Sequence, residues 1–181
     1  MKRLALMALM VSLAGCGGGG GDDDVGADIK NLISSTNAID GKTVRPSDAD
    51  LPLVIAVESH SADIDKILLS LERIEQVAGY QIIRYSNGTE QADITIKSSN
   101  VGCLTSIPLG NWQYTIEVGD MASCPNVTFD LVAYKIFGLN RTDKDSYRVL
   151  KAQSTLADSA LATIYNNPPN TPISELIVIS K

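Results

Sequence analysis

The chain of 181 residues contains a single histidine, His60, and three cysteines, which limits the chemistry it can perform. His60 stands between Ser59 and Ser61, and a serine with a histidine can form a hydrolytic pair. Neighbours on one turn do not point at each other, however, and no Gly-x-Ser-x-Gly sequence is present to expose a nucleophile. One histidine cannot build a three-histidine zinc site either. We therefore expect His60 to be a surface or helix-capping residue.

The first cysteine, Cys16, follows a segment with the properties of a secretory signal. Lys2 and Arg3 supply positive charge, and Leu4–Leu13 is apolar but too short to cross about 30 Å of hydrocarbon. The sequence Leu13-Ala-Gly-Cys16 resembles the bacterial lipobox. This resemblance implies a signal peptide over residues 1–15, lipidation of Cys16 and a membrane anchor of several acyl chains. The alternative is an ordinary secretory signal in which Cys16 occurs by chance.

A glycine-rich stretch follows the lipidation site. Gly17–Gly21 cannot bury apolar surface, and Asp22–Asp24 continue the polar sequence. We interpret residues 16–50 as the lipidated cysteine and a flexible linker, in which Asp28–Ile33 forms at most a short helix. By resemblance to lipoprotein sorting signals, glycine rather than aspartate at position 17 implies the outer membrane. The expected location is therefore the bacterial cell envelope, with the chain held by its lipid.

The composition of the mature chain limits its partners. Removing residues 1–15 leaves 166 residues, enough for one domain with a hydrophobic core. These residues include 13 basic and 21 acidic side chains, a net charge near −8 without any basic stripe, so we expect no nucleic-acid partner. Cys103 and Cys124 remain as a pair. In an oxidising compartment such a pair predicts a disulfide, and two buried thiols are the alternative.

The folded body is predicted to begin at residue 51. Leu51–Glu58 is rich in β-branched residues, which is typical of a strand buried on both faces. Ser61 or Asp63 then caps an amphipathic helix that ends at Gly79. Alternating or β-branched residues predict three further strands, at Tyr80–Tyr85, Ala92–Lys97 and Trp112–Val118.

Two helices and a tail complete the predicted body. The first helix runs from Pro125 to about Phe137, is largely apolar, and is stopped by Gly138. The second begins with a capping box at Thr155 and ends near Asn166, and residues 173–179 could add a strand. This order predicts an α+β domain over residues 51–181. Its single mixed sheet of four to five strands is covered by a long helix, with a buried helix and a C-terminal helix.

The order of these elements resembles the metzincin zinc peptidases, in particular matrixin-type domains. In that family a helix with the pattern H-E-x-x-H-x-x-G-x-x-H holds zinc through three histidines, and its glutamate is the general base. The resemblance covers roughly residues 51–170 and includes the sequence Gly138-Leu139-Asn140, with the Met-turn position near Leu150. Aligned on the glycine, the five pattern positions fall on Leu131, Val132, Lys135, Gly138 and Arg141.

The resemblance implies a zincin-like domain that has lost its catalytic residues. Val132 cannot act as a base, and Lys135 and Arg141 would repel a metal ion. We therefore expect no metal or other cofactor, and a binding or structural module rather than an active enzyme. A peptide or protein ligand could pair with a sheet edge at the former cleft. The two cations would then favour an anionic group, or pair with Asp130, Asp143 or Asp145.

Two other interpretations stay open. A hydrolase of another type would need a non-standard metal site, or carboxylates such as Glu58, Asp120 and Asp130 converging in a cleft. An unrelated α+β lipoprotein would share only the order of elements with the zinc peptidases. Strand order separates these cases, because a matrixin-like sheet is mostly parallel with one antiparallel edge strand. Here that strand should come just before the active-site helix or one strand earlier.

Overall fold

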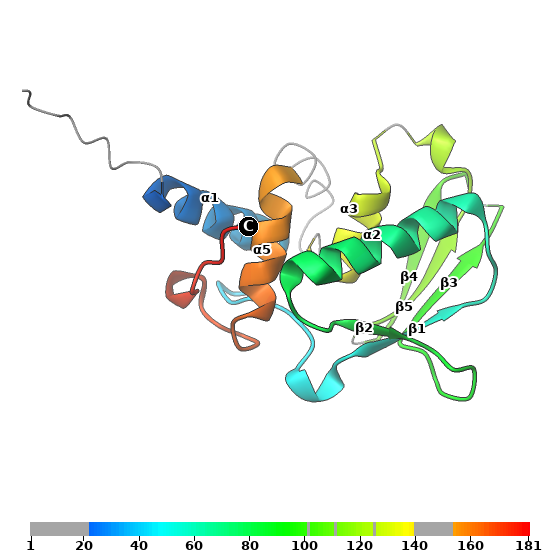
Figure 1. The fold of residues 1–181 in the computed structure, drawn as a ribbon, viewed down its shortest axis with the longest axis horizontal. Coiled ribbons are helices and arrows are strands. Elements are labelled where there is room, and N and C mark those ends of the chain that lie inside the picture. Colours follow the sequence, from blue (N-terminus) through cyan, green and yellow to red (C-terminus); the bar gives the residue numbers. More distant parts are fainter. Residues whose placement is uncertain (1–21, 101, 111, 125, 140–153) are drawn as a thin grey trace, which may run out of the picture.

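The computed structural model describes residues 22–100, 102–110, 112–124, 126–139 and 154–181, and these residues form an α+β fold (Figure 1). The predicted α+β class and mixed sheet are confirmed. The strands of the single five-stranded sheet are β1 Leu53–Val57, β2 Ile83–Tyr85, β3 Ile94–Ser98, β4 Leu104–Gly110 and β5 Gln113–Val118. The α-helices in the described residues are α1 Asp22–Thr36, α2 Ala62–Ala78, α3 Phe129–Ile136 and α5 Ser154–Tyr165.

The sheet has the strand order β2-β1-β3-β5-β4. Neighbouring strands are parallel throughout, except that β4 runs antiparallel to β5 at one edge. In the central register Ile55 pairs with Ile94, and Ile96 pairs with Ile116, so that buried β-branched side chains lie side by side. Strand β4 was not predicted from the sequence. It lies one strand before β5, the strand that leads to α3.

Helix α2 lies across the sheet, as Figure 1 shows. Its buried residues recur at helical spacing and face the sheet and the other helices. The Ser61 hydroxyl caps its first turn by accepting a hydrogen bond from the Ile64 amide at 3.2 Å. Gly79 ends it in the left-handed conformation, with φ of 70°. Both predicted ends of this helix are therefore confirmed.

The linker assigned to residues 16–50 is wrong from Asp22 onward, because these residues begin with a helix that belongs to the core. Ile29, Leu32 and Ile33 of α1 are all 0% exposed. The helix packs against α5, at the other end of the chain (Figure 1). Aspartates at its N-terminus suit the positive end of the helix dipole, and its apolar residues form one stripe. The folded body therefore starts near residue 22 rather than at residue 51.

The last three predicted elements also differ from the structure. Helix α3 begins at Phe129 rather than Pro125, because the Thr128 hydroxyl caps it by accepting from the Leu131 amide at 3.2 Å. Helix α5 begins at Ser154, so Thr155 lies inside it rather than at its cap. Residues 173–179 form no added strand but a 3-10 turn over Ile173–Glu175 and an irregular tail.

Side chains of the α5 region hold this tail in place of a β-ladder. The backbone amide of Ile177 donates to Asn167 Oδ1 at 3.0 Å, and the amide of Ile179 donates to Thr163 Oγ1 at 2.9 Å. Both acceptor side chains are buried. The tail therefore satisfies backbone groups without pairing to a strand.

Candidate functional site

The candidate site lies at the end of α3, where Gly138 stops the helix as predicted. Gly138 has φ of 101°, its amide donates to the Lys135 carbonyl at 3.1 Å, and the Leu139 amide donates to the Tyr134 carbonyl at 2.9 Å. These two hydrogen bonds make a Schellman motif, which favours glycine at this position. A Cβ atom on Gly138 would also lie 3.1 Å from the Trp112 ring, so both the backbone conformation and the close contact disfavour a side chain here.

Three segments from distant parts of the sequence hold this turn. Asn37, just after α1, donates from Nδ2 to the Gly138 carbonyl at 2.9 Å. The Tyr165 hydroxyl, at the end of α5, donates to the Phe137 carbonyl at 2.9 Å. Trp112, just before β5, packs its ring against the glycine and has a positive φ of 61°. All three side chains are buried, so the chain leaves α3 through a fixed and enclosed turn.

The structure places the residues that the sequence aligned with the zinc-binding pattern in two environments. Leu131 and Val132 are 2% and 1% exposed and belong to the apolar core. Lys135 is half-buried, and burial lowers the pKa of its amine. Arg141 and the Met-turn position near Leu150 lie outside the described residues. The suggestion that Lys135 and Arg141 act together therefore stays a prediction.

Asp130, a suggested partner for those cations, instead belongs to a polar cluster that joins three helices. Arg73 of α2 lies 3.4 Å from Asp130 of α3 and 3.0 Å from Asp158 of α5. The Tyr134 hydroxyl donates to Asp158 Oδ1 at 2.6 Å. Burial acts to lower the pKa of Arg73, but its hydrogen bonds to Tyr134 and Asp158 and the nearby carboxylates outweigh this, so the net pKa is raised. Burial and the bond to Asp158 raise the pKa of Tyr134.

We expect Tyr134→Phe to flatten the loss of stability at alkaline pH. Because folding raises the tyrosine pKa above its ordinary value of 10.0, the unfolded chain loses this proton first. The contribution of Tyr134 is therefore complete below pH 10 and is lost as the pH rises above it. At pH 7 the lost hydrogen bond costs about 1–2 kcal/mol. Urea unfolding measured from pH 7 to pH 11 tests both effects.

Tyr85 provides a comparison for that experiment. Burial first, and then Glu72, raises the pKa of Tyr85 to about 12, so Tyr85→Phe should also flatten the alkaline limb. It should cost less at pH 7, because its 3.3 Å bond to Glu72 is exposed. If the free energy of unfolding of Tyr134→Phe fell as steeply with pH as that of the wild type, the polar cluster would not have the assigned role.

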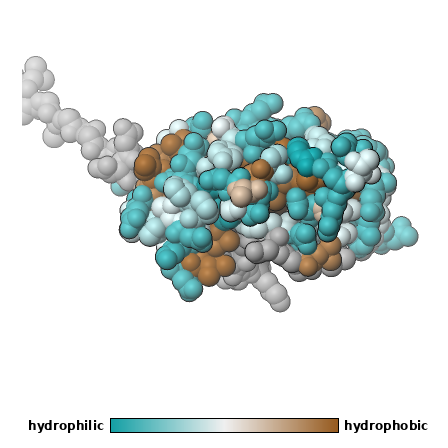
Figure 2. Space-filling view, turned by 90° about the horizontal axis from the view of Figure 1, so that it is seen from below, coloured by the Kyte–Doolittle hydropathy of each residue, from teal (hydrophilic) through white to brown (hydrophobic). Residues whose placement is uncertain are grey.

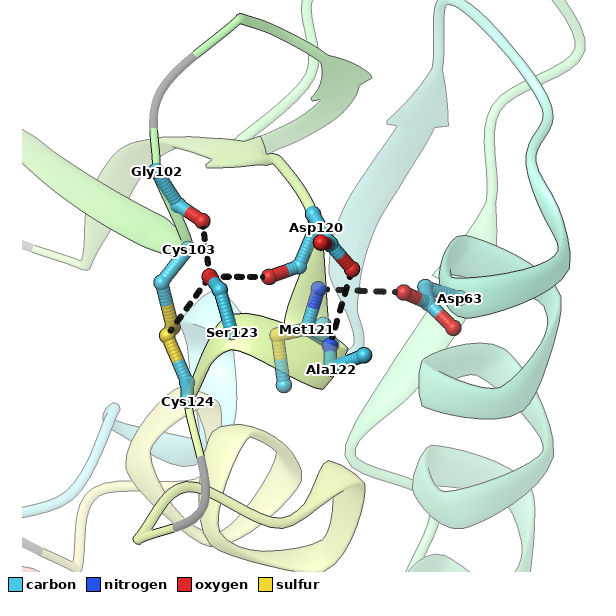
Figure 3. The surroundings of a disulfide bond; sticks show 8 residues. All are labelled: Asp63, Gly102, Cys103, Asp120, Met121, Ala122, Ser123 and Cys124. Atoms are coloured by element: carbon cyan, nitrogen blue, oxygen red, sulfur yellow. Dashed lines mark hydrogen bonds between the residues drawn. A yellow bond between two sulfur atoms is a disulfide. The ribbon is translucent and has the colours of Figure 1, made fainter.

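A disulfide between Cys103 and Cys124 is confirmed (Figure 3). The loop that it closes contains β4 and β5. Cys103 precedes β4, and Cys124 follows a 3-10 turn over Met121–Ser123. The Asp120 carboxylate caps this turn by accepting from the Ala122 amide at 3.0 Å. Asp63 of α2 accepts from the Met121 amide at 3.2 Å. The start of the edge strand is thus tied covalently to a turn that α2 also holds.

The backbone of β4 presents a free edge to its outer side. The Gly119 amide donates to the Cys103 carbonyl at 2.6 Å, which makes these residues a hydrogen-bonded pair of the antiparallel ladder. Hydrogen-bonded and non-hydrogen-bonded pairs alternate along this register. The backbone N–H and C=O groups of Thr105 and Ile107 therefore point toward β5, whereas those of residues 104, 106 and 108 point outward. Position 108 is proline, which lacks a backbone N–H. Because this position points outward, the pairing with β5 loses no hydrogen bond. No described strand pairs with this side of β4.

The carboxylates considered for another hydrolase lie apart in local roles. Glu58 is exposed after β1, Asp120 caps the 3-10 turn, and Asp130 pairs with Arg73. Within the described ranges no group of three or more His, Cys, Asp or Glu side chains could hold a metal ion. His60 is 69% exposed in its side chain and lies 3.1 Å from Asp65, which confirms it as a surface residue.

Comparison of the chain with known protein families, with curated proteins and with solved structures found no match. Among the described residues, no helix has the length and apolarity needed to cross a membrane. The strand order, the enclosed turn after α3 and the free edge of β4 are therefore the observations from which function can be argued.

Proposed function

We propose that this chain is an envelope lipoprotein with a metzincin-like body that lacks catalysis and binds an extended peptide segment along β4. The observation that supports this most strongly is the single antiparallel strand at the sheet edge. It lies one strand before the strand leading to α3, which is one of the two placements a matrixin-like sheet predicts. The lipid anchor rests on the sequence around Cys16, and the outer membrane on Gly17.

The proposed loss of catalysis rests on the side chains at the zinc-binding positions. Leu131 and Val132 supply neither a ligand nor a general base, and both are buried in the core. Lys135 places a cation at the second histidine position. Helix α3 therefore keeps its packing role and its terminal turn, while Leu131, Val132 and Lys135 offer a zinc ion neither a ligand nor a general base.

We expect the mature chain, purified without a histidine tag and dialysed against zinc, to hold far less than one zinc ion per chain. The reason is that only one histidine is present, and among the described residues no three His, Cys, Asp or Glu side chains form a group that could hold a metal ion. Elemental analysis of the dialysed protein measures this directly, with an aliquot treated with chelator as the control. Stoichiometric zinc that survives dialysis would contradict the proposal and point to an enzyme with an unforeseen ligand set.

The proposed ligand pairs with β4 through main-chain hydrogen bonds. Leu104 and Ser106 each direct an N–H and a C=O outward, and Pro108 directs only its C=O. A peptide in β conformation can therefore form a short ladder that ends at the proline. Each such bond contributes about 1 kcal/mol net, so side-chain contacts must supply the rest of the affinity.

We expect Ser106→Pro to weaken peptide binding about tenfold or more, because it removes an outward N–H and places a ring in the path of the added strand. Peptides selected from a random library on the mature chain provide the ligands, and titration calorimetry measures their affinities. Ser106→Ala is the matched control, since it keeps the N–H, and it should bind as the wild type does. Circular dichroism checks that both variants are folded. Selected peptides that bind Ser106→Pro with unchanged affinity would place the binding site elsewhere.

A further inference from the structure

The structure brings the anchored end of the chain and the sheet to opposite ends of the molecule. Helix α1 begins at Asp22, only six positions after Cys16. Its N-terminal end lies at one end of the longest axis, and the sheet occupies the other end (Figure 1). Asp24 and Asp28 are exposed on the first turns of this helix. The point at which the chain enters its folded body is therefore also the point farthest from the sheet.

The length of chain between the lipid and α1 limits how the body can face the bilayer. Six residues reach at most about 20 Å, whatever their conformation. A compact body of this size is about 40 Å across. The tether is thus shorter than the body, so the body cannot turn over and place its sheet end first against the membrane.

Charge and surface character oppose the remaining alternative, in which the body lies flat on the bilayer. The mature chain has a net charge near −8, and bilayers with anionic lipids repel such a surface. Figure 2 shows one face covered mostly by hydrophilic side chains, with hydrophobic side chains in separate patches. The exposed large apolar side chains come from six separate parts of the chain: Val25, Ile39, Leu69, Tyr85, Leu109 and Ile177. No single apolar face of the described residues would hold the body down.

We propose that the α1 end is the membrane-facing surface and that the free edge of β4 points away from the bilayer. This inference rests on the lipid anchor of the proposed function. This orientation also limits the ligand. An extended segment approaches β4 from the aqueous phase, so it belongs to a molecule other than the lipids that face the α1 end. Repulsion between the acidic first turns of α1 and anionic lipids keeps the α1 end from lying directly on the bilayer surface.

Förster energy transfer to acceptor-labelled lipids tests this orientation on the full lipidated chain. Asp28→Cys and Leu109→Cys variants each carry one fluorophore, since Cys16 is acylated and the other two cysteines are bonded. Both are reconstituted into phosphatidylcholine and phosphatidylglycerol vesicles that contain a lipid with an energy acceptor on its headgroup, which quenches a nearby label by energy transfer. Because the tether holds the start of α1 within about 20 Å of the bilayer, we expect energy transfer to quench the Asp28 label about threefold more than the Leu109 label.

A lengthened tether is the matched control. Inserting about 30 Gly and Ser residues after Gly21 lets the body move away and rotate, so the two labels should become similar. Equal or stronger quenching at position 109 in the acylated wild-type background would overturn the orientation alone. Intact-mass measurement of the wild type and of Cys16→Ser separates the other failure. A wild-type chain without acyl mass would overturn the lipid anchor, and the orientation with it.

Discussion

Leu32→Ala is expected to lower the free energy of unfolding by about 2–5 kcal/mol. Leu32 is 0% exposed and lies in the stripe of α1 that packs against α5. Truncation there removes apolar contacts and leaves a cavity that the two helices cannot fully close. Urea denaturation of the mature chain, monitored by circular dichroism, measures the change.

Asn31→Ala is the matched control on the same helix. Asn31 is exposed, so its replacement should change the free energy of unfolding by no more than about 0.5 kcal/mol. The pair of variants distinguishes a helix that packs into the core from one that forms without contributing to the stability of the fold. Equal and small effects at positions 31 and 32 would mean that α1 does not contribute to the core, and the linker interpretation of residues 16–50 would return.

The double variant Cys103→Ser, Cys124→Ser is expected to lose about 3 kcal/mol of stability, because the unfolded chain regains the entropy of the closed loop. The two cysteines are 21 residues apart in sequence. The same loss should appear when the wild type is unfolded in the presence of a reductant. Comparing the two proteins with and without dithiothreitol measures this effect.

The reductant also serves as the control for the disulfide experiment. It should leave the double variant unchanged, since Cys16, the remaining cysteine, is acylated in the mature chain that we propose. A wild type whose stability did not respond to reduction, while the double variant remained weak, would assign the loss to the serine side chains and not to the cross-link.

The elements that the sequence predicted best are those with a local physical signature. Helix α2 combines an apolar stripe with a serine cap and a left-handed glycine, and all three signals depend only on neighbouring residues. Strands β1, β3 and β5 were recognisable from β-branched or alternating residues. The Gly138 turn was predictable for the same reason, because a glycine after an apolar helix is a common stop.

The missed elements lack such signatures. Strand β4 contains Pro108 and Gly110, which normally argue against a strand, and it is stabilised by pairing with β5 at the edge of the sheet. Helix α1 follows a polyglycine run, starts with aspartates and contains Gly26, so its short apolar stripe resembled a linker. Both depend on tertiary contacts that local propensity cannot show.

The candidate site was predictable at its centre but not in its surroundings. Gly138 could be named from the sequence, whereas its contact with Asn37 joins residues 101 positions apart. The Arg73–Asp158 pair joins residues 85 positions apart. No periodicity in the sequence encodes such pairs, because each needs the packing of α1, α2 and α5 to be known first.

The contact between α1 and α5 also has a consequence for the order in which the chain can fold. Helix α1 is synthesised first, and its stripe of Ile29, Leu32 and Ile33 finds its partner only when residues 154–165 have been made. The contact between α1 and α5 joins residues far apart in the sequence and so raises the contact order. High contact order slows folding and delays the burial of this apolar stripe. A nascent chain stopped before α5 should therefore expose the apolar stripe of α1 to solvent.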